Sequence, residues 1–193
     1  MRIIAGQRRG MKLLSPQSSG TRPITDRVKE ALFNVIQNYD SLDGKYVADL
    51  FCGTGSLGLE ALSRGAKLVF FVDRNPNVIV SLKKNIEKAG YTERSIVMKA
   101  DALRFGASRT DLNRKCDIIF VDPPYVCTQN IRQESSLGKL LTRLSELIQR
   151  NGIVVVRTRR STVLAASYQG LKTMNRREWG TMAVTILGLG NDE

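Results

Sequence analysis

The chain has 193 residues, 42% of them apolar, which suits one globular domain with a full hydrophobic core. Its 30 Lys and Arg residues outnumber 18 Asp and Glu residues, and the resulting net charge of +12 favours a polyanionic partner such as nucleic acid. The sequence contains no His, which excludes Ser-His-Asp catalysis and removes the commonest metal ligand.

The apolar pattern and the cysteines indicate where the protein works. No apolar run approaches the roughly 18 residues of a membrane helix, and the N-terminus lacks the apolar stretch of a signal peptide. Cys52, Cys116 and Cys127 are far apart and form no CxxC pair, so neither a disulfide framework nor a zinc site is indicated. We therefore expect a cytoplasmic protein with no membrane partner and no metal.

The N-terminal segment is basic. Residues 1–14 alternate apolar and polar side chains around Gly6 and Gly10, which predicts a β-hairpin with a basic tip. Thr25 or Asp26 is a suitable cap for a helix over 26–38. We expect residues 1–38 to be an RNA-binding extension of a single domain, 1–193. Its candidate phosphate contacts are Arg8, Arg9, Arg22, Thr25 and Arg27, each of which could equally be an ordinary surface residue; Arg22 and Thr25 could also line the active site.

From residue 44 buried strands alternate with helices. The predicted strands are 46–51, 68–73, 95–99, 117–121, 152–157, 171–177 and 182–188, and the predicted helices are 56–64, 76–89 and 137–150. This alternation predicts an α/β fold with a parallel sheet covered by helices. The last two strands meet at residues 179–181, which leaves no room for a helix and predicts an antiparallel hairpin. Residues 126–136 are polar and aperiodic, which predicts a mobile loop.

A glycine-rich turn follows the first of these strands. Gly53, Gly55 and Gly58 match the GxGxxG spacing of a dinucleotide-binding turn, so an NAD-linked oxidoreductase is one interpretation. Asp49, however, stands inside the end of the strand, ahead of the glycines. A carboxylate there would repel a pyrophosphate but attract a cationic amino group, such as that of S-adenosylmethionine (SAM). The turn therefore favours SAM over a nicotinamide cofactor.

Acidic residues also end the next two strands. Asp73 ends the second strand and can accept hydrogen bonds from both hydroxyls of a ribose. Asp101 and Ala102 follow the third strand, where an acid can accept from an adenine amino group. Open α/β sheets bind ligands at this carboxyl edge. Three acids at successive strand ends therefore predict one cofactor site.

The fourth strand ends in Asp122-Pro123-Pro124-Tyr125. The two prolines cannot donate backbone hydrogen bonds and stop the sheet. The remaining corner offers a carboxylate and carbonyl oxygens as acceptors, with an aromatic ring beside them. It suits a planar molecule with an exocyclic amino group, such as a nucleobase. The alternative is a turn that only ends the strand.

With these residues, the chain resembles the class I SAM-dependent methyltransferases, and most closely the bacterial 16S ribosomal RNA guanine-N2 methyltransferases of the RsmD type. The resemblance covers almost the whole chain. The matching segments are Met1-Arg2-Ile3-Ile4-Ala5-Gly6, Arg9-Gly10, Arg22-Pro23-x-Thr25-Asp26-Arg27-Val28-Lys29-Glu30, Asp49-Leu50-Phe51-x-Gly53-Thr54-Gly55, Leu59-Glu60-Ala61-Leu62-Ser63-Arg64-Gly65, Phe71-Val72-Asp73-Arg74 and Asp122-Pro123-Pro124-Tyr125. The N-terminal segments discriminate this family from adenine-N6 and glutamine methylases.

The resemblance implies a Rossmann-like fold with a seven-stranded, mostly parallel sheet in the order 3-2-1-4-5-7-6, strand seven being antiparallel. It implies methyl transfer from SAM to N2 of a guanine, of the guanine-966 type, in 16S ribosomal RNA. The RNA would be presented in the small ribosomal subunit or an assembly intermediate, and the protein would be a monomer. The catalytic residues would be Asp122, Pro123, Pro124 and Tyr125. The cofactor-binding residues would be Asp49, Phe51, Gly53, Thr54, Gly55, Asp73, Arg74, Asp101, Ala102 and Asp122.

The chain departs from the family pattern after the fifth strand, where Arg157 stands in place of the usual glutamate. The loop after Tyr125 is also long for the family. Two alternatives therefore remain beside the guanine enzyme and the oxidoreductase. One is an adenine-N6 nucleic-acid methyltransferase, which usually carries a separate target-recognition domain. The other is a non-catalytic RNA-binding assembly factor.

Overall fold

The computed structural model describes residues 1–15, 24–107 and 114–190. Its chain forms two compact units, Met1–Ala100 and Asp101–Glu193, each of which is described separately below. None of the helices described in these ranges is both long and apolar enough to cross a membrane. The predicted organisation as a single domain with residues 1–38 as an extension stays a prediction.

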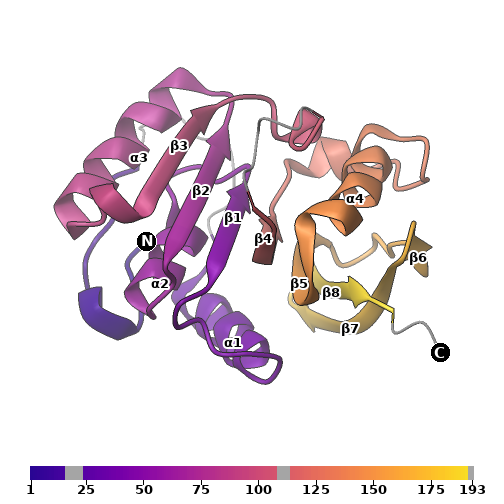
Figure 1. Cartoon of the computed structure of the whole chain (residues 1–193), viewed down its shortest axis with the longest axis horizontal. Helices are drawn as coiled ribbons and strands as arrows, with labels where there is room; N and C mark the ends of the chain where they lie inside the picture. The colour runs from indigo at the N-terminus through magenta and orange to yellow at the C-terminus, as the bar shows by residue number, and fades with distance from the viewer. Residues whose placement is uncertain (16–23, 108–113, 191–193) are drawn as a thin grey trace. The chain divides into compact units, whose positions relative to one another are not determined.

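The first unit is built on three parallel strands in the order β3-β2-β1 (Figure 1). They are β1 (Tyr46–Leu50), β2 (Leu68–Asp73) and β3 (Ser95–Lys99). Consecutive residues of β1 and β2 are buried, as expected for strands covered on both faces. The bounds of β2 and β3 are those predicted from the sequence.

Three α-helices belong to this unit: α1 (Asp26–Gln37), α2 (Ser56–Ser63) and α3 (Pro76–Ala89). Thr25 caps α1, as predicted, because its hydroxyl accepts a hydrogen bond from the Val28 amide. Asn75 caps α3, and Pro76 at the first helical position is pre-organised for the helix. A short 3-10 helix, η2 (Thr92–Arg94), leads into β3.

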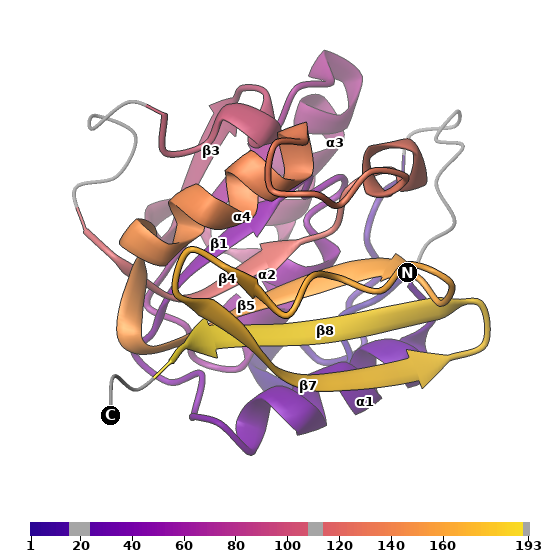
Figure 2. The same ribbon diagram turned by 90° about the vertical axis from the view of Figure 1, so that its right-hand side faces the viewer.

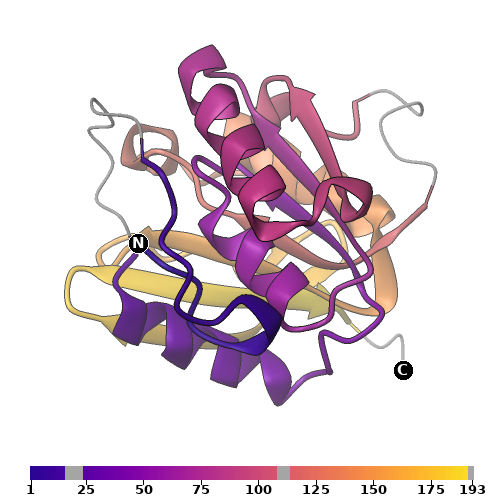
Figure 3. The same cartoon turned by 90° about the vertical axis from the view of Figure 1, so that its left-hand side faces the viewer.

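The β-hairpin predicted over 1–14 is confirmed only in outline. Its two arms run antiparallel, and the amides of Ile3, Gly10 and Leu13 donate across to the carbonyl oxygens of Met11, Ile3 and Met1, but the arms form no regular strand pair. These residues form a 3-10 helix, η1 (Gly6–Arg8), and a single isolated bridge between Arg2 and Lys12. Figure 3 shows this segment, in indigo, lying along the first unit. A Cβ atom on Gly6 would lie 1.8 Å from the Ser63 carbonyl oxygen, so only glycine lets the turn of this segment pack so closely on α2.

Buried polar side chains hold the N-terminal segment in place. The Glu60 carboxylate accepts hydrogen bonds from the Ile4 amide at 2.7 Å and the Ala5 amide at 3.0 Å. Lys29 Nζ donates to the Arg2 carbonyl oxygen at 2.6 Å and lies 3.6 Å from Glu60. Burial lowers the pKa of Lys29, and the charge of Glu60 opposes this shift. Backbone groups of the N-terminal segment thus take the place of water as hydrogen-bond partners of the charged Lys29 and Glu60 side chains.

The second unit contains a mixed sheet in the order β4-β5-β8-β7-β6 (Figure 2). The strands are β4 (Cys116–Val121), β5 (Ile148–Arg159), β6 (Ser167–Tyr168), β7 (Leu171–Trp179) and β8 (Met182–Leu189). β4 and β5 are parallel, and the other neighbours are antiparallel. The unit also contains α4 (Ser136–Leu147) and the 3-10 helices η3 (Ala102–Arg104) and η4 (Tyr125–Thr128).

The α/β class and the strand orders within both units agree with the prediction, since β8, the predicted strand seven, lies between β5 and β7. The predicted hairpin at 179–181 is confirmed by the pairing of Trp179 with Met182. The two-residue strand β6 was not predicted. The helix predicted over 137–150 ends at Leu147 because Ile148 pairs with Cys116, after which the register shifts.

Candidate functional site

The glycine turn of the first unit is tightly packed. Gly55 has φ +81°, and a Cβ atom there would lie 2.5 Å from Leu82 Cδ1. Its amide donates to the Cys52 carbonyl oxygen at 2.8 Å. Only glycine satisfies both the left-handed backbone and the close packing. The backbone of the turn is therefore held in a single conformation, as a loop that binds a ligand through its backbone requires.

Phe51 precedes this turn with φ +60°, an unusual value for a bulky residue. Such a conformation costs about 1–3 kcal/mol and occurs mainly where the surrounding structure enforces it, often at a functional site. Phe51 is half-buried, at the junction of β1 and the glycine turn. The unusual backbone of Phe51 therefore lies in the same segment that the sequence motifs predicted to bind the cofactor.

Asp49 and Asp73 hold the turn by hydrogen bonds to its amides. Asp49 is 1% exposed, and its Oδ2 accepts from the Gly58 amide in the first turn of α2 at 2.8 Å. Asp73 Oδ2 accepts from the Gly53 amide at 3.0 Å, and its Oδ1 accepts from the Asn75 amide at 2.9 Å. Each carboxylate oxygen can accept more than one hydrogen bond. The structure thus gives both acids a positioning role on the loop.

Thr54 and Asn85 complete the loop. Asn85 is fully buried and donates to the carbonyl oxygens of Thr54 at 3.1 Å and Leu14 at 3.0 Å. Its own Oδ1 accepts from the Leu14 amide at 2.8 Å. By contrast, Thr54 Oγ1 is buried and has no hydrogen-bond partner among the described residues. An unpaired buried hydroxyl is costly and is expected where a ligand supplies the partner.

The remaining cofactor candidates contribute less distinctive geometry. Arg74 is exposed, and Asp101 caps η3 by accepting from the Leu103 amide at 3.0 Å. Ala102 is buried in that short helix. Burial and the charges of Asp49 and Asp73 raise the pKa of Cys52 well above its usual value, which disfavours the reactive thiolate beside the turn.

In the second unit, Asp122 forms an ion pair with Arg157. Arg157 Nε donates to Asp122 Oδ1 at 2.5 Å, and the two side chains are 14% and 20% exposed. Val121, the last residue of β4, pairs with Val156 of β5. Asp122 and Arg157 follow these two residues directly, so the parallel register brings their side chains together. Burial raises the pKa of Asp122, and Arg157 lowers it through its charge and hydrogen bond.

Each member of this pair keeps unused hydrogen-bonding capacity. Asp122 Oδ2 accepts no hydrogen bond from any residue in the described ranges. Arg157 Nη1 is buried and, within the same ranges, has no acceptor. Of the two, the buried Arg157 Nη1 is the costlier to leave unpaired, and a buried donor of this kind is normally satisfied by a ligand or water.

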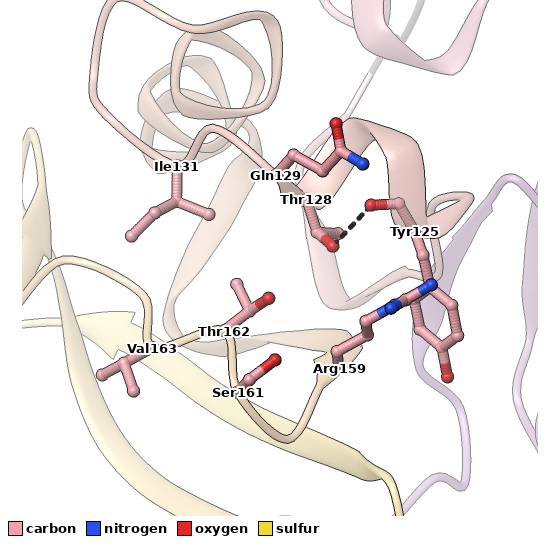
Figure 4. A pocket seen from close by; sticks show the side chains of 8 residues that line it. All are labelled: Tyr125, Thr128, Gln129, Ile131, Arg159, Ser161, Thr162 and Val163. Atoms are coloured by element: carbon pink, nitrogen blue, oxygen red, sulfur yellow. Dashed lines mark hydrogen bonds between the residues drawn. The ribbon is translucent and has the colours of Figure 1, made fainter.

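Tyr125 is half-buried and begins η4, directly after Pro123 and Pro124. The Arg159 guanidinium carbon lies 4.9 Å from the centre of the Tyr125 ring, within the range of a cation–π contact. Tyr125 and Arg159 also line a pocket of the second unit, together with residues that follow each of them (Figure 4). No local pattern indicated Arg159, because it lies 34 positions after Tyr125 in the chain.

The RNA-binding candidates are placed unevenly. Arg8 Nε donates to the Ala89 carbonyl oxygen at 2.6 Å, so this guanidinium is held against the protein. Arg9 and Arg27 are exposed, and Thr25 is the cap of α1. Arg22 lies outside the described residues. The sequence interpretation also missed the buried Lys29, Glu60 and Asn85, since polar residues within helices are usually exposed.

Comparisons with known proteins agree with this reading of the chain. A family model described as "Conserved hypothetical protein 95" matches residues 1–188. The Bacillus subtilis (strain 168) protein named "Putative rRNA methyltransferase YlbH" is 35% identical over 188 residues, covering 96% of this chain and 97% of that protein. "Ribosomal RNA small subunit methyltransferase D" of Haemophilus influenzae is 42% identical over 130 residues, covering 65% of this chain and 64% of that protein.

A solved structure from Escherichia coli described as "Putative methyltransferase yhhF" superposes with a TM-score of 0.81 at 29% identity, covering 98% of this chain and 97% of that one. This likeness confirms the predicted Rossmann-like methyltransferase fold. The chain therefore belongs to the Conserved hypothetical protein 95 family, the RsmD-type methyltransferase family that its sequence motifs resemble.

Proposed function

We propose that this protein transfers a methyl group from SAM to the exocyclic N2 amine of one guanine in small-subunit ribosomal RNA. The observation that carries the proposal is the corner at the end of β4. There, Asp122 has one oxygen fixed by Arg157 and a second without a hydrogen bond among the described residues. The names of the similar proteins support ribosomal RNA as the substrate.

The glycine turn of the first unit fits SAM. Thr54 Oγ1 is the unpaired buried hydroxyl, and Gly53 has open space where a side chain would stand. Asp73 would accept from the ribose hydroxyls, while Asp49 would attract the amino group and Asp101 the adenine amine. Phe51, Gly55, Arg74, Ala102 and Asp122 would complete the proposed set of cofactor-binding residues. Bound SAM supplies an electrophilic methyl group on a sulfonium.

The corner would activate the amine by orienting it. An exocyclic amine is a poor nucleophile because its lone pair is delocalised into the ring. Asp122 Oδ2 and the Pro123 carbonyl oxygen would accept its two N–H groups, which directs the lone pair toward the methyl group. Alignment of this kind can contribute roughly 7–11 kcal/mol. The amine loses a proton after the transfer, once its nitrogen is cationic and acidic, so no histidine base is needed.

Pro124 and Tyr125 would complete the base site. Pro124 fixes the chain direction into η4, and the Tyr125 ring would stack on the guanine. Stacking on an aromatic side chain contributes about 1–3 kcal/mol per base. This offsets part of the few kcal/mol required to take the base out of its own stack.

Arg157 would position Asp122. The ion pair fixes one carboxylate oxygen, and the charge of Arg157 opposes the rise in the pKa of Asp122 that burial causes. The charge of Arg157 thus favours the ionised carboxylate, in which both oxygens can accept hydrogen bonds. The buried Arg157 Nη1, which has no acceptor among the described residues, would donate to a ring nitrogen of the base. In this proposal Arg157 replaces the family's glutamate without removing activity.

The substrate would be the small ribosomal subunit or an assembly intermediate, bound by a monomer in the cytoplasm. Arg9 and Arg27 are the exposed candidates for phosphate contacts, and Arg8, Arg22 and Thr25 complete the proposed set from the N-terminal extension. The excess of positive charge over the whole chain supports an RNA partner.

Methyl transfer from labelled SAM to undermethylated small ribosomal subunits, followed by nucleoside mass analysis, tests the proposal. We expect N2-methylguanosine with the natural protein and none with Asp122→Ala. Methyladenosine would assign the chain to the adenine-N6 alternative. Tight binding of SAM and RNA without transfer would establish the non-catalytic assembly factor instead.

A further inference from the structure

A pocket of about 530 Å³ lies beside the Asp122 corner, entirely within the second unit (Figure 4). One wall comes from η4 and the turn after it, and the other from the segment that follows β5. Its lining residues are Tyr125, Thr128, Gln129, Ile131, Arg159, Ser161, Thr162 and Val163. Asp122 and Pro123 are not among them, so the pocket shares only Tyr125 with the corner proposed to hold the reacting amine.

The lining of the pocket is mixed in a way that suits a nucleotide. Arg159 supplies a cation, Ser161 and Thr162 supply hydroxyls, and Gln129 supplies an amide. Ile131 and Val163 supply apolar surface for a base or a sugar. The lining contains no carboxylate that would repel a phosphate. The volume is within the roughly 300–1,000 Å³ range of small-ligand sites.

Arg159 connects the pocket with the corner. Its guanidinium stacks on one face of the Tyr125 ring at 4.9 Å, and the residue remains exposed. Figure 4 shows the two side chains next to each other at one end of the pocket. A guanidinium held by an aromatic ring keeps its N–H groups in a defined plane, and phosphate is the ligand that such a planar donor recognises best.

We propose that this pocket binds the nucleotide adjacent to the target base, with Arg159 contacting the phosphate that joins the two. The inference rests on the proposed function and extends it, because it makes the enzyme read the RNA strand at a second position. Tyr125 is then shared: it stacks on the target base and carries the arginine that holds the next phosphate. The Ser161 and Thr162 hydroxyls and the Gln129 amide contact the flanking sugar and base.

Photo-cross-linking tests the position of the nucleotide directly. Val163 is 63% exposed and lines the pocket, so Val163→p-benzoylphenylalanine places a reactive group there with little disturbance. The probe is the undermethylated small ribosomal subunit. We expect the cross-link within one nucleotide of the base that the natural protein methylates. The same group at Val80, an exposed residue of α3, is the matched control and should not give this cross-link.

Kinetics provide a second, independent measurement. Arg159→Ala removes the proposed phosphate contact, and Ser161→Trp fills the pocket. Each change should raise KM for the subunit about tenfold. Their affinity for SAM should be unchanged. Arg150→Ala removes an exposed positive charge outside the pocket and should change KM less than twofold.

The outcomes separate this inference from the function on which it rests. If the natural protein methylates the subunit but the Val163 cross-link maps far from the methylated base, or both pocket variants keep a normal KM, the flanking-nucleotide site is wrong and the proposed function stands. If the natural protein transfers no methyl group, the proposed function itself fails. A variant that does not fold is replaced by Thr162→Trp, which fills the same pocket from a neighbouring position.

Discussion

The glycine turn of the first unit and the corner of the second differ in how their polar groups are satisfied. In the turn, Asp49, Asp73 and Asn85 hydrogen-bond the loop backbone, and the Thr54 hydroxyl is the exception. In the corner, Asp122 and Arg157 bond each other and both keep capacity for a further partner. The turn is a preformed scaffold, whereas the corner depends on a ligand to satisfy it. Changes in the turn should therefore reduce stability, and changes in the corner should reduce activity.

The largest effect is expected at the corner. Asp122→Ala removes the acceptor for the amine and should lower the rate of methyl transfer by about 10²–10³-fold, as loss of a preorganised group does. Binding of SAM should change far less, because the glycine turn supplies most of the proposed cofactor contacts. Transfer rates on small ribosomal subunits and calorimetric SAM affinity measure both quantities. An unimpaired variant would show that the corner does not activate the amine.

Asn85→Ala tests the other half of the comparison. It removes three hydrogen bonds, which join Asn85 to the Leu14 amide, the Leu14 carbonyl and the buried Thr54 carbonyl. We expect the free energy of unfolding to fall by about 2–4 kcal/mol, measured by urea denaturation. Asn77→Ala, at an exposed position of the same helix, is the control and should change it by less than about 0.5 kcal/mol. Equal effects of the two changes would contradict the scaffold role of Asn85.

The pH dependence of methyl transfer in the variant Arg157→Met tests whether Arg157 lowers the pKa of Asp122. Transfer requires ionised Asp122, so the rate falls as pH falls through the pKa of this group. Burial raises that pKa and Arg157 lowers it, so removing Arg157 raises it further. The acid limb of the pH–rate profile should therefore move to higher pH, while Arg157→Lys should retain most of the natural profile. An acid limb that stays in place or moves to lower pH would exclude this role.

The smallest effect is expected in the N-terminal segment. Arg9→Glu should weaken binding to small ribosomal subunits a few-fold and reduce its salt dependence, because one phosphate contact is lost. The single change at Arg9 is cleaner than a double change with Arg8, whose guanidinium also bonds the Ala89 carbonyl oxygen. Binding measured across a salt series provides the slope. A loss of SAM affinity instead would assign Arg9 to the cofactor loop.

Local patterns in the sequence predicted most of the elements. The bounds of β2, β3 and α3 follow from apolar periodicity and from the Asn75-Pro76 start of the helix, which are properties of neighbouring residues. The glycine turn and the Asp122–Tyr125 corner were also readable, because their backbone demands specific residue types at fixed spacing. These segments were sufficient to indicate the family and the chemistry.

The tertiary structure alone decided which distant residues meet. The register of β4 on β5 brings Arg157 to Asp122, and the packing of residues 1–14 on α2 and α3 gives Glu60 and Asn85 backbone partners in place of water. Residues 1–14 form an irregular antiparallel pair of arms around η1 in place of the regular hairpin that was predicted. Such contacts join residues tens of positions apart, so no periodicity encodes them. They exist only after the sheet and helices bury the surrounding surface and make each unpaired polar group costly.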